Sequence, residues 1–338
     1  LAIGHPLFEK AIETVAADTD FHGNSFLAQL FALLLFLVYP RARQVSKESV
    51  AARLTGAAVP EDVKSGMPGK RYACLYSWTE SDKMFKNFGL EVGLASRVVW
   101  LSGASSGLGR AAAEGFHRAG WQVVSGARSF EGRQGEGPMG YCLALDVTKE
   151  DSVAAFVEAA LARSGPPDAL VCAAGIITLG PAQTTSPEEL CSVMDTNFLG
   201  AVRLVQAVLP LLQERGTGKI ALLSSVNGLM PTPYQGAYVA SKHALEGWAE
   251  CLMLETRGSG VQVMLVEPGD HQGGSARYRA HAAVCAEMYR ESFERVCQTI
   301  NRDESQGGRP QAFAGKLVRV VERKRLPARL RATTIKEY

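Results

Sequence analysis

The sequence predicts an α/β fold for residues 96–338, a doubly wound parallel sheet with helices on both faces, preceded by a mostly helical extension. Two observations carry this prediction. From Arg97 onward, short apolar runs of strand length alternate with longer segments that have helical spacing. The connection at residues 102–109, between the first such run and the first helix, contains three glycines, which suits a tight turn from strand to helix.

The predicted strands and helices follow one another without a repeat or a low-complexity segment. Strands are expected at residues 98–101, 122–125, 141–145, 169–173, 219–223 and 261–266. Helices are expected at 108–119, 152–162, 188–212 and 236–255, the third of them bent near Gly200. A helical insertion from Arg279 to Ile300 follows, and the basic stretch from Lys316 to Arg331 contains a helix that ends before Pro327.

Composition and charge narrow the class of protein. Of the 338 residues, 46% are hydrophobic and 21% are charged, which is ordinary for a soluble globular protein. The formal charge of +2 gives no reason to expect a nucleic-acid partner. The seven cysteines lack the spacing of metal ligands, and most stand among apolar residues as core thiols do, which indicates a reducing compartment and no disulfide framework. We therefore expect a cytoplasmic protein with no metal site, and no secretory signal pattern is visible.

Residues 1–95 are predicted to form a helical extension that packs on the main domain. Their most apolar run, residues 26–39, has 14 residues, whereas a membrane-spanning helix needs about 20. Two interpretations remain. The run packs on the main domain or across a dimer interface, or it lies in a membrane surface with Arg41 and Arg43 at the headgroups. We favour packing, because the run is apolar on nearly every side and lacks a polar face.

A nucleotide site is predicted at the glycine-rich turn. The run from Ser102 to Gly109 fits the pattern T-G-x-x-x-G-x-G, with Ser in place of Thr. Its glycines allow a tight turn and close approach of a pyrophosphate, and a helix that begins at Gly107 points its N-terminus at that charge. A plain strand-to-helix turn is the alternative. The position between a buried strand and an amphipathic helix favours the nucleotide.

The end of the second predicted strand bears on the choice of dinucleotide. An acid there would bind a ribose 2′-hydroxyl, while an arginine would accept a 2′-phosphate. The sequence reads Ser-Gly-Ala-Arg, ending at Arg128. This favours NADP(H), although a surface arginine is the plain alternative and the nearby Glu131 keeps NAD(H) open.

Ser225, Tyr238 and Lys242 are the candidate catalytic residues. Tyr238 and Lys242 are four apart, so on a helix they share one face. A free phenol has a pKa of about 10, and an ammonium one turn away favours the phenolate. Ser225 follows a predicted strand and can hold a carbonyl or alcohol oxygen. A helical Tyr/Lys pair alone is more often a surface contact, but together with Ser225 and the glycine turn it indicates proton transfer to an oxygen.

These motifs occur in an order that resembles the classical short-chain dehydrogenases/reductases, from Val98 to Gly269. The resemblance implies a Rossmann-type fold, a nicotinamide cofactor and a substrate lid at about residues 271–310. It also implies that Asn197 is a fourth catalytic residue, which positions a water beside Lys242. Asp146 and Val147 match the family's adenine-side pair.

Two departures from the family pattern stand out. Cys172-Ala173-Ala174-Gly175 replaces the usual Asn-Asn-Ala-Gly, so the asparagine that braces the neighbouring strands is absent. The Thr expected after Pro268-Gly269 is missing too, and Ser275 or backbone groups are expected to substitute for it.

The turn and the resemblance together give a complete set of site residues. The catalytic residues are Asn197, Ser225, Tyr238 and Lys242. The cofactor-binding residues are Gly103, Ser105, Ser106, Gly107, Leu108, Gly109, Arg128, Asp146, Val147, Ala174, Gly175, Tyr238, Lys242, Pro268 and Gly269.

The implied activity is hydride transfer between nicotinamide and a carbonyl or secondary alcohol. Tyr238 is the general acid or base, Ser225 stabilises the oxygen, and Lys242 lowers the pKa of Tyr238 and binds the ribose. Apolar residues near the site favour a small lipophilic substrate. The motifs from Ser225 and Tyr238 onward look like those of 17β- and bacterial 20β-hydroxysteroid dehydrogenases, which implies a steroid.

Several alternatives stay open. Retinoid-like and 3-oxoacyl carbonyls are the other substrate classes. A non-catalytic nucleotide-binding sensor is the other kind of protein, against which the complete Ser/Tyr/Lys set argues. The long helices at Glu188 and Tyr238 resemble the family's subunit interfaces, so we expect a homodimer or homotetramer.

Overall fold

The computed structural model describes residues 97–273, 275 and 279–332. The predicted helical extension, residues 1–95, and its apolar run 26–39 lie outside the described residues. Among the helices of the described residues, none combines the length and apolarity needed to cross a membrane.

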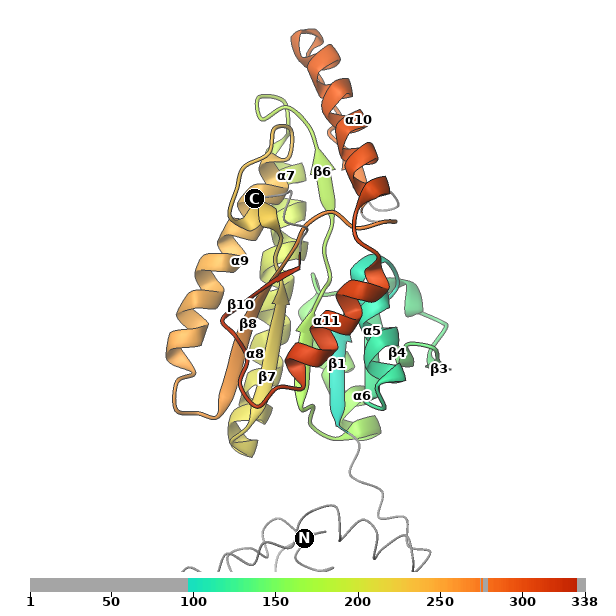
Figure 1. Cartoon of the computed structure of the whole chain (residues 1–338), viewed down its shortest axis with the longest axis vertical. Helices are drawn as coiled ribbons and strands as arrows, with labels where there is room; N and C mark the ends of the chain where they lie inside the picture. Colours follow the sequence, from blue (N-terminus) through green and yellow to red (C-terminus); the bar gives the residue numbers. More distant parts are fainter. Residues whose placement is uncertain (1–96, 274, 276–278, 333–338) are drawn as a thin grey trace, which may run out of the picture. The chain divides into compact units, whose positions relative to one another are not determined.

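An eight-stranded sheet in the order β10-β8-β7-β5-β1-β2-β4-β3 forms the centre of the described fold (Figure 1). Seven of these strands are parallel, and β3 pairs antiparallel with β4. The strands are β1 (Val98–Ser102), β2 (Gln122–Ala127), β3 (Gly135–Gly137), β4 (Gly140–Ala144), β5 (Ala169–Cys172), β7 (Gly218–Leu223), β8 (Val261–Pro268) and β10 (Arg329–Ala332). From β1 the chain runs outward to β4 and then returns to β5, so the direction of winding reverses between β1 and β5. This is the predicted doubly wound sheet.

Helices cover both faces of the sheet. On one face lie α5 (Gly107–Arg118) and α11 (Pro310–Val321). On the other lie α6 (Glu150–Ser164), α8 (Gly200–Arg215) and α9 (Gly236–Glu255). Successive residues of β1 point to opposite faces, and the whole strand is buried because both faces are covered.

The helical stretch predicted for 188–212 is interrupted where the sequence indicated a bend. It consists of α7 (Pro187–Met194), a π-helical segment η5 (Asp195–Leu199) and α8. A Cβ on Gly200 would lie 2.5 Å from Cγ2 of Val147. Glycine therefore allows this helix to pass close to the loop after β4.

The insertion after β8 differs from its prediction. A helix was expected from Arg279, but residues 279–281 form the strand β9 (Arg279–His281), which pairs parallel with β6 (Ile177–Leu179). The segment η7 (Glu287–Tyr289) and the helix α10 (Arg290–Gln306) come later. The expectation of a helix from Arg279 was wrong because pairing with a distant strand overrides the helical spacing of its apolar residues.

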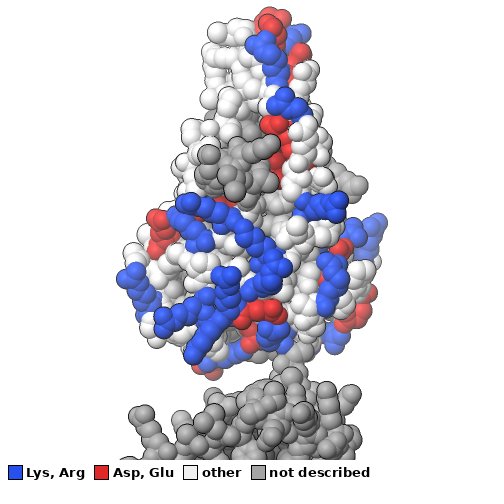
Figure 2. All heavy atoms as spheres, viewed as in Figure 1, with Lys and Arg blue, Asp and Glu red and all other residues white. Residues whose placement is uncertain are grey.

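The basic C-terminal stretch contains the helix end expected before Pro327 and, after it, a strand that the sequence did not predict. The α11 helix ends at Val321, where Lys219 Nζ donates hydrogen bonds to the carbonyl oxygens of Val321 and Arg323, at 2.6 and 2.8 Å. The chain then enters β10 beside β8. Figure 2 shows Lys and Arg side chains gathered over α11 and β10.

Candidate active site

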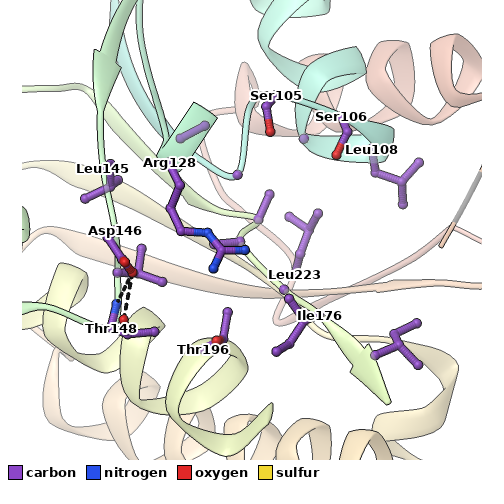
Figure 3. A pocket seen from close by; sticks show the side chains of 18 of the residues that line it. Ser105, Ser106, Leu108, Arg128, Leu145, Asp146, Thr148, Ile176, Thr196 and Leu223 are labelled. Carbon is purple, nitrogen blue, oxygen red and sulfur yellow. Dashed lines mark hydrogen bonds between the residues drawn. The ribbon is translucent and has the colours of Figure 1, made fainter. Parts of the chain in front are cut away.

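A cavity of about 550 Å³ lies at the carboxyl ends of the strands, where the winding reverses. Its wall includes every predicted cofactor residue except Gly107 and Gly269. Ala127, Ser129, Leu145, Thr148, Ala173, Ile176, Ile177, Thr196, Leu223 and Ser224 also line it, and Figure 3 shows many of these side chains.

The glycine turn forms one end of the cavity. Gly103 has φ +72°, and a Cβ there would lie 2.6 Å from the carbonyl carbon of Ala173. A Cβ on Gly109 would lie 2.2 Å from the carbonyl oxygen of Gly103. Both positions therefore need glycine, and α5 begins at Gly107 with Ser105 and Ser106 before it on the cavity wall. This arrangement fits a pyrophosphate at the N-terminus of α5.

Arg128 follows β2 and points into the cavity (Figure 3). Asp146 lies on the same wall, and its Oδ1 accepts hydrogen bonds from the backbone N and the hydroxyl of Thr148, at 3.0 and 2.7 Å. Burial opposes the charged form, but these bonds and the cations Arg128 and Lys149 hold the pKa of Asp146 below its ordinary value. Glu131, the residue that kept NAD(H) open, is not part of the cavity wall.

Tyr238 and Lys242 both line the cavity from α9, with Lys242 Nζ 5.6 Å from the centre of the Tyr238 ring. Lys242 is 4% exposed and donates a hydrogen bond to the Leu223 carbonyl oxygen at 2.7 Å. Burial lowers the pKa of Lys242 to about 8, and the nearby Glu246 partly opposes that shift. Ser225 follows β7, is 8% exposed, and accepts a hydrogen bond from the backbone N of Asn227 at 3.2 Å.

Asn197 lies behind the cavity wall in η5. Its Oδ1 accepts a hydrogen bond from Ile176 N at 2.7 Å, and its Nδ2 donates to Ile176 O at 2.9 Å and to Ser241 Oγ at 3.0 Å. A Cβ on Gly175 would lie 3.4 Å from Asn197 Oδ1 and 3.9 Å from Lys242 Nζ. Asn197 thus holds the cavity-lining segment after β5 against the catalytic helix.

Ser102 braces the two strands that the missing asparagine would have braced. Its hydroxyl accepts hydrogen bonds from the backbone N of Ala173 at 3.2 Å and of Ala174 at 3.3 Å. Cys172, which stands at the first asparagine position, is buried, and burial raises the pKa of its thiol to about 12. The sequence signal for Ser102 was its place at the start of the glycine turn, where it was interpreted only as a replacement for Thr.

Ser275, expected to replace the missing Thr, is engaged elsewhere. Its hydroxyl donates to Glu304 Oε1 at 2.5 Å and accepts from Arg279 Nε at 2.8 Å. Arg279 also pairs with Glu304, so the three residues tie β9 to α10. Ser275 is not part of the cavity wall.

The fold and the cavity together define a dinucleotide-binding oxidoreductase. A glycine turn at which a Cβ would meet backbone atoms, the cation Arg128 and a Tyr/Lys pair share one cavity. This is the arrangement that hydride transfer with proton transfer requires.

Comparison with known proteins identifies the family. Residues 97–281 match the family model described as short chain dehydrogenase. The chain belongs to the short-chain dehydrogenase family and is an NAD(P)-dependent oxidoreductase of that family.

Two curated relatives match this chain over most of their own length, and a third matches over a shorter part. The 3-ketodihydrosphingosine reductase of Bacteroides thetaiotaomicron is 35% identical over 69% of this chain and 86% of its own. Retinol dehydrogenase 8 of Bos taurus is 33% identical over 71% of this chain and 82% of its own. The human 17-beta-hydroxysteroid dehydrogenase type 1 is 42% identical, but over 38% of each chain. These relatives differ in substrate, so they do not distinguish the hydroxysteroid subtype that the sequence motifs implied.

Solved structures share the fold. A short-chain dehydrogenase from Streptomyces avermitilis has a TM-score of 0.63 at 31% identity, over 70% of this chain and 87% of its own. An alcohol dehydrogenase from Thermococcus sibiricus, complexed with 5-hydroxy-NADP, has a TM-score of 0.56 at 25% identity, over 71% of this chain and 97% of its own.

Proposed function

We propose that this enzyme reduces the carbonyl group of a small lipophilic substrate with NADPH, or oxidises the corresponding alcohol in reverse. One observation carries the proposal: Tyr238 and Lys242 line the same cavity as the glycine turn and Arg128. A proton donor and a dinucleotide site therefore share one space.

The dinucleotide, when bound, supplies or accepts the hydride. The chain's own residues handle the oxygen and its proton. Tyr238 donates a proton to the carbonyl oxygen or removes it from the alcohol, and Ser225 holds that oxygen. The Lys242 ammonium favours the Tyr238 phenolate and donates toward the ribose. Asn197 keeps the segment at Ile176 in place beside these groups.

The preference for NADP(H) rests on Arg128. Its guanidinium points into the cavity, and no acidic side chain at the end of β2 lines the wall to bind a ribose 2′-hydroxyl. Guanidinium groups bind phosphate through paired hydrogen bonds. NAD(H) is the alternative cofactor.

For the substrate we propose a long-chain ketone first. The support is the match to 3-ketodihydrosphingosine reductase, which covers 86% of that protein. A retinoid is the second candidate, supported by retinol dehydrogenase 8. A ketosteroid, the expectation from the motifs around Ser225 and Tyr238, is the third, because the steroid relative matches over 38% of the chain.

The test is oxidation of NADPH and of NADH, in parallel, with 3-ketodihydrosphingosine, all-trans-retinal and oestrone. The Tyr238→Phe variant is the control and should lose roughly 10²- to 10⁴-fold in turnover while still binding NADPH. We expect turnover of at least one of these three carbonyl compounds with NADPH. If NADPH binds tightly and no carbonyl is reduced, the sensor alternative replaces the enzyme proposal.

We further propose that the protein is a homodimer or homotetramer that assembles through its long helices α8 and α9. Light scattering after size exclusion measures this directly. A monomer at micromolar concentration would refute it.

A further inference from the structure

Tyr234 has a backbone conformation that needs an explanation. Among the described residues it is the one non-glycine residue with positive φ, at +62°. This conformation is costly for a bulky side chain and persists only where the surrounding contacts hold it. Tyr234 stands four residues before Tyr238, at the approach to the catalytic helix α9.

The side chain of Tyr234 contacts α10. Its hydroxyl lies 2.5 Å from Ser292 Oγ. Ser292 donates its own proton to the Tyr289 carbonyl oxygen at 3.0 Å, so Tyr234 is the donor in the bond between the two hydroxyls. The Tyr234 ring also packs edge-on against Phe293, with 5.3 Å between ring centres, and against Tyr289, with 6.4 Å.

Gln235, the residue after Tyr234, is hydrogen-bonded to residues that neighbour the catalytic groups. Gln235 accepts a hydrogen bond from Val239 N at 2.8 Å in the first turn of α9, which carries Tyr238. The Gln235 side chain accepts another from Asn227 Nδ2 at 2.9 Å. Asn227 N in turn donates to Ser225 Oγ at 3.2 Å. Hydrogen bonds and the covalent link between Tyr234 and Gln235 thus connect Ser292 to Ser225, and to Val239, which directly follows Tyr238.

The helix α10 has few other attachments. It contains no buried residue, and it projects beyond the end of the sheet (Figure 1). Arg279 holds its second half through Glu304 and Asn301. Tyr234 holds its first turn at Ser292 and Phe293, where the ring of His281 from β9 also packs edge-on against Phe293, with 5.5 Å between ring centres. Elements with little buried surface open at low free-energy cost, so α10 is suited to move when a substrate enters or leaves.

We propose that Tyr234 is a positioning residue that couples α10 to the catalytic groups. The inference rests on the proposed carbonyl reduction. When Ser292 holds the Tyr234 phenol, the chain from Ser225 to Tyr238 is held in its catalytic arrangement. When α10 leaves, Tyr234 is released and the two hydroxyl groups lose their alignment. Reduction is thereby limited to the state in which α10 is in place against Tyr234.

The test compares Tyr234→Phe and Ser292→Ala with the matched control Tyr289→Phe. The control removes a phenol hydroxyl one position from α10, which donates to Gln183 at 2.9 Å, and leaves the Tyr234 bond intact. We expect kcat to fall roughly tenfold in each test variant, as small misalignments of reacting groups cause. The double variant should lose no more than either single one, because both remove the same bond.

Three readouts separate positioning from a structural role. The KM for NADPH and the melting temperature should stay at their wild-type values in all variants. Hydrogen–deuterium exchange should become faster at residues 225–239 in Tyr234→Phe and Ser292→Ala, but not in Tyr289→Phe. The exchange measurement needs no turnover, so it tests the coupling even if the proposed substrate class is wrong.

Clear results would overturn the proposal. One is a kcat within twofold of the wild type in both test variants. Another is an equal loss in Tyr289→Phe, and a third is unchanged exchange at residues 225–239. If the wild-type enzyme reduces none of the three carbonyl compounds named above, that result counts against the proposed function. The exchange result would still decide the coupling.

Discussion

The proposed preference for NADP(H) rests on Arg128. It is the arginine on the cavity wall, whereas Glu131 lies off that wall. Hydrogen bonds between charged partners contribute about 1.5–3 kcal/mol. We therefore expect Arg128→Leu to raise the KM for NADPH about 10- to 100-fold and to change the KM for NADH little. Steady-state kinetics with both dinucleotides measures this, and Glu131→Gln is the control that should leave the ratio unchanged.

A preference that survives in Arg128→Leu would show that another group binds the 2′-phosphate. A shift of the ratio toward NADPH in Glu131→Gln would instead show that the acid competes with Arg128 for the ribose.

Lys242 should make the stability of the folded enzyme rise with pH. Burial lowers its pKa to about 8, while an unfolded lysine titrates at about 10.4. Between these values the unfolded chain binds more protons than the folded one, so stability rises with pH. The charged lysine destabilises the fold below a pH of about 8, and this penalty disappears as the pH rises toward about 10.4.

We therefore expect Lys242→Met to be inactive yet more stable than the wild type at neutral pH. The difference in melting temperature should narrow as the pH is raised from about 8 to about 10. Lys316→Met, which changes an exposed lysine, is the control. A difference that stays constant with pH would contradict the prediction.

At the scale of residues, spacing predicted the groups that share one element. Tyr238 and Lys242 lie on the same face of α9 and line one cavity, as four-residue spacing on a helix requires. The brace from Ser102 to the backbone of Ala173 was not predicted. That bond joins residues 71 apart, and local sequence carries no signal for such a pair.

At the scale of elements, two helical glycines make a matched pair. Gly109 lies in α5, where a Cβ would meet the Gly103 oxygen at 2.2 Å; Gly247 lies in α9 with nothing within 4 Å. We expect Gly109→Ala to destabilise the protein by about 2 kcal/mol or more and to weaken NADPH binding, because α5 must shift. Gly247→Ala should stabilise it by about 0.5–1 kcal/mol.

Urea unfolding and NADPH titration of the two variants check this pair. Equal stability changes in both variants would mean that helix propensity alone determines the effect, and that the close approach at the glycine turn contributes nothing.

The long elements were predictable and the short ones were not. Strands such as β1 and β8 consist mainly of apolar residues, and their burial on both faces of the sheet explains that pattern. In contrast, β6 and β9 have three residues each and exist through pairing with each other. The same holds for β10, whose four residues alternate between basic and apolar and pair with β8. Short strands of this kind are set by tertiary contacts.

At the scale of the whole molecule, β10 ties the C-terminal part of the chain to the catalytic core. Arg329 pairs with Glu267 at the end of β8 and with Glu246 and Glu250 on α9. Glu267 is 0% exposed and directly precedes Pro268 on the cavity wall. One arginine therefore neutralises carboxylates from two elements that both reach the active site.

The free energy of unfolding should therefore depend strongly on Arg329. Removing one partner of a buried ion pair leaves an unpaired charge and costs about 3–5 kcal/mol. We expect Arg329→Met to lower the free energy of unfolding by about 3 kcal/mol, since Arg331 alone then remains near Glu267, at 3.4 Å. Arg325→Met, at an exposed arginine between α11 and β10, should change it by less than about 0.5 kcal/mol.

Adding Glu267→Gln to Arg329→Met should restore much of the lost stability, because the buried charge is removed together with its partner. Urea denaturation of the three variants decides the question. If the double variant is as unstable as Arg329→Met, the loss comes from the packing of β10 against β8. If Arg325→Met lowers the free energy of unfolding equally, the positive charge around α11 and β10 as a whole determines stability, and the ion pair at Glu267 has no special role.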